Sequence, residues 1–233
     1  REAATEHYGA SHPVVASATN NLALAHKHLG EFKEASSLFE SALSVYKEVL
    51  GEEHPSTITT MSNTGLVFKA MAEAAKGIEG MALTDNAAGY LEHALELRKA
   101  QAGPKAPEVA LALCHLASVR RLQGNTTDAE ELLMEAAAMF EPGDVHPFRG
   151  TILNNLGFLL KDLKQFDRAR RCYEEAVSVR EQVHGKAHIE TVSSMHNLAE
   201  LLIAMGLDDD AAIIQQTILE RLGHEPQPPA QGE

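Results

Sequence analysis

A short segment that starts with glycine, usually followed by histidine and proline, recurs five times along this chain. The glycines at 9, 51, 103, 143 and 185 lie 42, 52, 40 and 42 residues apart. Glycine favours the left-handed conformation that closes a helix, and proline suits the first turn of the next helix. The segments read Gly9-Ala10-Ser11-His12-Pro13, Gly51-Glu52-Glu53-His54-Pro55, Gly103-Pro104-Lys105-Ala106-Pro107, Gly143-Asp144-Val145-His146-Pro147 and Gly185-Lys186-Ala187-His188-Ile189. Such regular helix stops and starts indicate a repeat protein.

The intervals between these junctions predict helices. Their long stretches without proline are rich in Leu, Ala, Glu, Lys and Met, which favour helices, whereas proline disrupts helix interiors. No Val/Ile/Thr run alternates as a strand would. We therefore predict an all-α fold with helices over 13–29, 31–50, 55–76, 81–102, 107–123, 126–140, 147–163, 166–183, 189–205 and 208–222.

The intervals also repeat one pattern of small and large residues, typical of two closely packed helices. The first contains Leu22-Ala23, Gly30, Phe32, Ala35 and Phe39, and the fourth contains Leu156-Gly157, Phe166, Ala169 and Tyr173. With Asn-Asn-Leu-Ala at 20–23, this pattern resembles tetratricopeptide repeats of the kinesin-light-chain-like kind, whose units have about 42 residues. The resemblance implies a right-handed α-solenoid of five helix-turn-helix hairpins.

The resemblance also implies a domain organisation. We expect one continuous solenoid over 9–223, because each repeat of such an array packs only on its neighbours. Its repeats are expected at 12–53, 54–105, 106–145, 146–187 and 188–223. Residues 1–8 resemble the tail of a preceding helix, and 224–233 are expected to form a flexible Pro/Gln-rich tail. Because the chain opens at Arg1 without an initiator Met, we expect a processed product or a piece of a longer protein.

Charge and composition exclude several partner classes. The net charge is −13, which disfavours binding to nucleic acid or to an anionic membrane surface. No stretch approaches the roughly 20 apolar residues of a membrane helix. Two cysteines 58 residues apart, Cys114 and Cys172, offer no disulfide framework, so a reducing compartment is expected. We expect a cytoplasmic protein, or alternatively a mitochondrial one with a removed targeting segment.

The second repeat is ten residues longer than its neighbours, with the extra residues between Lys69 and Ala87. The segment is helix-prone on both sides of Gly77 and Gly80, so we expect both helices of this hairpin to be elongated. Its tip would present a set of apolar side chains, namely Met71, Ile78, Met81 and Leu83. The insertion is either a tolerated loop extension or a contact site for a partner.

The two residues before the Leu-Ala pair of each first helix are rich in asparagine. We assign this pair of positions to the concave groove, and its candidate binding residues are Asn20, Asn21, Asn63, Asn154, Asn155, His196 and Asn197. An amide both donates and accepts hydrogen bonds, so a column of amides could pair with the backbone of an extended peptide. The alternative is that these side chains bond to the neighbouring repeat. The family resemblance favours the peptide role.

Cations recur four residues after the small residue of each first helix. They are Lys27, Lys69, Arg121 and Lys161, and the fifth repeat has Ile203 there. A basic ladder along the groove would suit an acidic peptide. The alternative is that these cations offset the dipole at the end of the helix.

These observations favour a non-enzymatic protein-binding module. No metal or catalytic motif of recognisable spacing is present, and four of the 12 histidines lie at junctions, where capping explains them. We expect no cofactor and no metal. The leading hypothesis is capture of an extended acidic segment of a partner in the groove. One alternative is a structural subunit or assembly factor of a large complex, with a mitochondrial location as an option. Another is self-association through uncapped ends.

Overall fold

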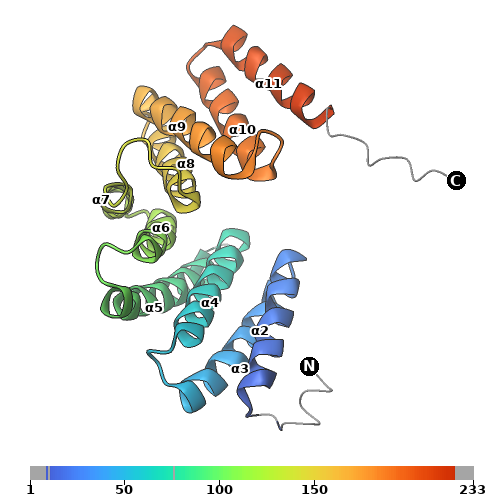
Figure 1. Cartoon of the computed structure of the whole chain (residues 1–233), viewed down its shortest axis with the longest axis vertical. Helices are drawn as coiled ribbons and strands as arrows, with labels where there is room; N and C mark the ends of the chain where they lie inside the picture. The colour runs from blue at the N-terminus through green and yellow to red at the C-terminus, as the bar shows by residue number, and fades with distance from the viewer. Residues whose placement is uncertain (1–8, 10, 76, 224–233) are drawn as a thin grey trace, which may run out of the picture. The chain divides into compact units, whose positions relative to one another are not determined.

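The computed structural model describes residues 9, 11–75 and 77–223, which form ten helices and contain no strand (Figure 1). This arrangement confirms the predicted all-α fold, and ten helices are consistent with five hairpins. The first helices of the hairpins are α2 (Pro13–His28), α4 (Pro55–Ala74), α6 (Pro107–Leu122), α8 (Pro147–Asp162) and α10 (Ile189–Ala204). The second helices are α3 (Phe32–Leu50), α5 (Gly77–Ala102), α7 (Thr126–Ala137), α9 (Phe166–His184) and α11 (Asp208–Gly223).

Two helix ends differ from the prediction by more than two residues. Helix α5 begins at Gly77 instead of residue 81, and α7 ends at Ala137 instead of residue 140. The prediction treated Gly77 and Gly80 as helix breakers. Gly80 is instead buried inside α5, where an added Cβ would lie 3.4 Å from the carbonyl oxygen of Ala75. An added methyl group would make an ordinary van der Waals contact there, and α5 includes both glycines.

Histidines cap the first helices at four of the five junctions. The Nδ1 atom of each accepts a hydrogen bond from the backbone N–H two residues later, which a helix start leaves without a partner inside the helix. These bonds measure 3.2 Å at His12, His54 and His146 and 3.3 Å at His188. The third junction has Ala106 there and no side-chain cap. Capping thus explains the junction histidines, as predicted.

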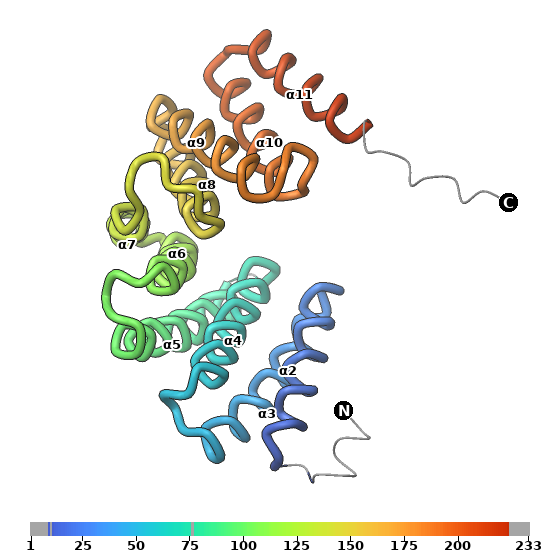
Figure 2. Tube along the Cα trace, viewed as in Figure 1, coloured from blue at the N-terminus to red at the C-terminus, as the bar shows by residue number. Residues whose placement is uncertain are grey.

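The helices are grouped in two compact units, residues 1–132 and 133–233. In the first, α2 packs on α3, α3 on α4, α4 on α5 and α5 on α6. In the second, α8 packs on α9, α9 on α10 and α10 on α11. The traces in Figure 2 show the hairpins α2–α3 and α4–α5 in the first unit, and α8–α9 and α10–α11 in the second.

The core of the first unit joins consecutive repeats. Phe39 of α3 is fully buried with Ala23 of α2 and Val67 of α4, so one aromatic ring fills space between two hairpins. In the second unit, Gly157 of α8 lies against the ring of Tyr173 of α9, at 2.9 Å from the position of an added Cβ. The small residue of the repeat therefore makes room for a large residue of the second helix.

The second hairpin is elongated as predicted. Helix α4 has 20 residues and the other first helices have 16. Helix α5 has 26 residues, whereas α3 and α9 have 19. The extension of α4 begins at Met71, so the residues Met71–Ala74 and the start of α5 form the tip that has no counterpart in the other hairpins.

Candidate protein-binding site

Two asparagines of the predicted groove join consecutive repeats. Asn20 of α2 accepts a 3.1 Å hydrogen bond from the hydroxyl of Thr60 on α4. In the second unit, Asn154 of α8 accepts a 3.0 Å bond from the hydroxyl of Ser194 on α10. In both cases the asparagine is the first of the pair before the Leu-Ala or Leu-Gly residues, and the donor lies 40 residues later. These two side-chain oxygens therefore stabilise the stacking of neighbouring hairpins.

The second residue of the pair varies more in its surroundings. Asn21 is exposed, whereas Asn63, Asn155 and Asn197 are half-buried. Asn197 donates a 3.0 Å hydrogen bond to Asn154, the same oxygen that Ser194 reaches. Asn21 is thus the most accessible amide among these four, and Asn197 is already engaged within the protein.

The charges of three cations of the first unit act on His115 of α6, which stands in the third repeat where the other repeats have asparagine. The ring is half-buried, and burial followed by the charges of Lys27, Arg98 and Lys69 lowers its pKa to about 4. The imidazole is therefore neutral at pH 7. The three cations that lower this pKa come from three helices, α2, α4 and α5.

Two of these cations form no ion pair among the described residues. Lys27 and Arg98 are both half-buried, and burial lowers the pKa of each. Within the described residues, neither side chain has a carboxylate within ion-pair distance, although the more distant Glu108 favours the charged form of Arg98. Lys69 pairs with Glu73 at 2.9 Å, one turn further along α4. Arg98 was not anticipated, because it lies on a second helix, outside the sequence position that the other cations share.

The remaining predicted cations are engaged or half-buried. Lys161 of α8 lies 3.0 Å from Glu200 of α10 and 5.4 Å from the centre of the Phe158 ring. This pairing with Lys161 is the main cause of a lowered pKa at Glu200, and His196 adds to it. His196 itself is exposed and lies 3.4 Å from the same carboxyl group. Arg121 is half-buried on α6.

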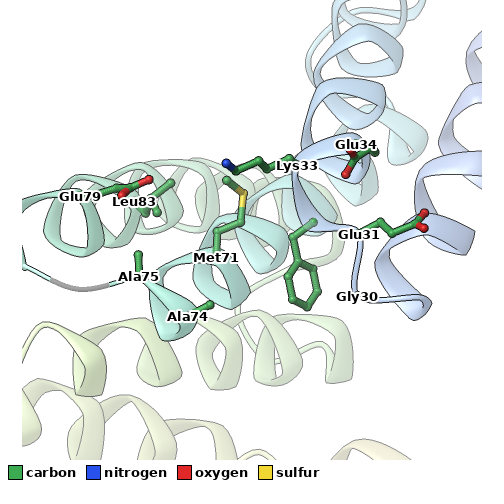
Figure 3. A pocket seen from close by; sticks show the side chains of 10 residues that line it. Gly30, Glu31, Lys33, Glu34, Met71, Ala74, Ala75, Glu79 and Leu83 are labelled. Carbon is green, nitrogen blue, oxygen red and sulfur yellow. The ribbon is translucent and has the colours of Figure 1, made fainter.

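The predicted hairpin residues divide into two groups. Ile78 and Met81 are 86% and 69% exposed. Met71 is half-buried and packs against the cluster that contains Phe39. It lines a pocket of about 450 Å³ between the start of α3 and the elongated hairpin, and Leu83 lines the same pocket (Figure 3). Ile78 and Met81 do not line it, so the structure separates the three residues that were predicted to act together.

Comparison with known proteins identifies the repeats. The model of the tetratricopeptide-repeat family matches residues 2–76, 81–141 and 148–222. The chain belongs to the tetratricopeptide-repeat family. This membership confirms the resemblance drawn from the junctions and from the repeated small residues.

The curated relatives of this chain include two proteins whose names refer to mitochondria. The clustered mitochondria protein homolog of Aspergillus clavatus is 26% identical over 176 residues, which are 75% of this chain and 13% of the relative. Tetratricopeptide repeat protein 19, mitochondrial, of Mus musculus is 31% identical over 156 residues, which are 67% of this chain and 41% of that protein. The aligned regions are thus a minor part of each relative.

Solved structures of the same fold are also similar. Kinesin light chain nearly identical TPR-like repeats from Podosopora anserina match with a TM-score of 0.66 and 19% identity, covering 93% of this chain and 99% of theirs. BtubC (BKLC) from P. vanneervenii matches with a TM-score of 0.63 and 21% identity, covering 95% and 86%. At these identities the likeness shows the fold alone. None of the described helices combines the length and apolar character needed to cross a bilayer.

Proposed function

We propose that this tetratricopeptide-repeat chain is a non-enzymatic protein-interaction module whose first unit captures an acidic segment of a partner. The observation that carries this proposal is that Lys27 and Arg98 are half-buried cations whose charges, with that of Lys69, act on a neutral His115. In a chain with 33 acidic and 20 basic residues, carboxylates are plentiful. Two half-buried cations nevertheless lack an ion-pair partner among the described residues.

The energetics favour an anionic ligand at this surface. A partly desolvated cation is costly unless a counter-charge compensates it. A carboxylate placed among Lys27, Arg98 and His115 would supply that counter-charge, and the exposed amide of Asn21 is available to a peptide backbone. Asn63 of α4 and Arg121 of α6, which belong to the same unit, extend the proposed contact.

Charge reversal tests this proposal. The probe is a short fluorescein-labelled peptide in which Asp and Glu alternate with Gly and Ser. Its binding is measured by fluorescence anisotropy. The double variant Lys27→Glu/Lys69→Glu should bind the peptide at least about tenfold more weakly, a loss of about 1.4 kcal/mol. The control is Lys105→Glu/Lys186→Glu, which has the same net charge and alters exposed junction residues. Equal losses in both variants would reject a localised site.

A second candidate function is supported by the elongated hairpin together with the mitochondrial names of the relatives. In this alternative the chain is a structural subunit or assembly factor of a larger, mitochondrial complex and docks through the hairpin. Deletion of residues 71–83 distinguishes the two functions. Loss of incorporation into a complex with peptide binding intact would favour this alternative, and the converse result would favour capture of an acidic segment.

A further inference from the structure

The pocket beside the elongated hairpin lies in the first unit and shares no lining residue with the cationic surface. Gly30, Glu31, Phe32, Lys33 and Glu34 line it from the start of α3, and the hairpin contributes Met71, Ala74, Ala75, Glu79 and Leu83. Figure 3 shows these two groups facing each other across the hollow. Its volume of about 450 Å³ is within the range of roughly 300–1,000 Å³ typical of binding clefts.

The insertion builds one wall of this pocket. A first helix of the 16 residues that the other hairpins have would end at Ala70, before Met71 and Ala74. Glu79 and Leu83 belong to the additional turns at the start of α5. The pocket is therefore a product of the extra residues, and a hairpin of ordinary length would leave the start of α3 without this wall.

The floor of the pocket is apolar and anchored. Phe32 and Met71 both pack against the buried cluster of Ala23, Phe39 and Val67, so the pocket opens directly onto the core. Ala74 is exposed and Ala75 is half-buried, and these small side chains leave the space open. An apolar side chain that entered here would remove its own surface and that of Met71 from water.

The rim of the pocket is acidic. Three carboxylates, Glu31, Glu34 and Glu79, surround the mouth together with one cation, Lys33. Glu31 pairs with His26 at 2.5 Å. Among the described residues, Glu34, Glu79 and Lys33 form no ion pair. Among the described lining residues, carboxylates therefore outnumber cations by three to one, and Glu34 and Glu79 have no ion-pair partner within that part of the chain.

We propose that this pocket binds an apolar side chain of a partner protein that is flanked on each side by Lys or Arg. The apolar side chain packs against the floor of the pocket, and the carboxylates of Glu34 and Glu79 form ion pairs with the flanking cations. Charge complementarity determines this choice, because a ligand with flanking carboxylates would be repelled by the rim. The expected partner segment is thus opposite in charge to the one proposed for the surface around His115.

The probe for this site is a short helix-forming peptide of Ala and Gln with one central Phe flanked by Arg one turn away on each side. Matched peptides replace Phe by Ala, or both Arg by Glu. With methyl-labelled methionine, the Phe/Arg peptide should shift the signal of Met71 and leave that of Met81 unchanged, because only Met71 lines the pocket. The two altered peptides should bind at least about tenfold more weakly.

Two variants test the location without disturbing the core. Ala74→Arg introduces a large cation at an exposed lining residue and should abolish the shift of Met71. Ala82→Arg adds the same charge at an exposed residue of the same hairpin outside the pocket, and should bind like the native protein. Circular dichroism melting should be unchanged in both variants.

Three outcomes of the peptide experiments would overturn the proposal. They are equal binding of the Arg-flanked and Glu-flanked peptides, equal effects of the two variants, and a peptide response at Met81 in place of Met71. Sedimentation of the protein without peptide tests whether a second copy of this chain occupies the pocket. Self-association that Ala74→Arg abolishes, with no peptide binding, would also reject a basic partner segment.

Discussion

The side-chain amide of Asn197 donates a 3.0 Å hydrogen bond to the side-chain oxygen of Asn154, 43 residues earlier in the chain. The hydroxyl of Ser194 donates to the same oxygen. One asparagine thus joins two consecutive hairpins of the second unit through two bonds. Asn154 and Asn197 therefore join repeats, and their bonded atoms are not available to a ligand without rearrangement.

Replacement of Asn154 should reduce the stability of the second unit. In Asn154→Ala, Ser194 is buried and loses its acceptor, so we expect a loss of about 1–3 kcal/mol in the free energy of unfolding. Asn21→Ala removes an exposed amide and should leave stability within about 0.5 kcal/mol of the native value. Urea unfolding followed by circular dichroism measures both. Comparable losses in the two variants would contradict a role of Asn154 in joining repeats.

The stability of the first unit should fall below about pH 6.5. The pKa of His115 is lowered from 6.5 to about 4 in the folded protein, so the unfolded chain binds a proton at a higher pH than the folded chain does. Stability contributed by the neutral ring is complete above about pH 6.5 and is lost as the pH falls toward 4. The slope is at most about 1.4 kcal/mol per pH unit.

The measurement for His115 compares the pH dependence of urea unfolding in the native protein and in His115→Gln, which cannot titrate. The native curve should be steeper between pH 6.5 and 4, and parallel curves would contradict the prediction. NMR titration of the imidazole offers a second test. Addition of the acidic peptide should raise the pKa of His115, because a nearby carboxylate offsets the charges of Lys27, Arg98 and Lys69.

The repeated junctions were sufficient to predict the fold, because a glycine stop and a proline start leave little freedom in where helices begin. The surroundings of individual side chains were less accessible from sequence. The role of Asn20 as an acceptor for Thr60 depends on which faces of two helices meet. Arg98 joins the cations around His115 from a second helix, so no repeated spacing indicated it.

The elongated hairpin illustrates the same limit. The ten additional residues predicted two longer helices with apolar residues at their tip. The sequence did not show which of these side chains pack against the core. Met71 packs onto the core and Ile78 lies in solvent, because they are on different helices with different neighbours. Similarly, Arg120 occupies the position that Phe68, Leu160 and Leu202 hold in other repeats of this chain. It is satisfied by an ion pair with Glu92 and a 2.8 Å bond to Gln123.

Exchanging caps between junctions should move stability in opposite directions. His54→Ala removes the acceptor for the N–H of Ser56 and should cost about 0.5–2 kcal/mol. Ala106→His introduces a histidine at the junction that lacks a side-chain cap and should stabilise the protein by up to about 1 kcal/mol. Thermal unfolding at pH 8 measures both. If Ala106→His had no effect while His54→Ala destabilised, capping at the third junction would depend on more than the histidine.

A matched pair of glycine variants should separate packing from helix propensity. In Gly157→Ala the added methyl group would lie 2.9 Å from the ring of the buried Tyr173, so overpacking should cost about 1–3 kcal/mol. In Gly89→Ala the methyl group meets nothing within 4 Å, so the same change should stabilise α5 by about 0.5–1 kcal/mol. Urea unfolding measures the difference. Stabilisation by both variants would show that Tyr173 moves aside easily.

Lys164 should be the residue whose replacement by glycine stabilises the second unit. It lies at the turn between α8 and α9 with a φ of 59°, where the equivalent turns at Gly30, Gly124 and Gly206 have glycine with φ of 78°, 81° and 75°. The left-handed region costs a residue with a Cβ roughly 1–2 kcal/mol. Glycine avoids this cost but gives the unfolded chain more conformational entropy, so Lys164→Gly should raise the free energy of unfolding by about 1 kcal/mol. Lys164→Ala removes the same charge and keeps the Cβ, so it should give no gain. If the two variants had equal stabilities in urea unfolding, the charge of the lysine, and not its backbone conformation, would account for the effect.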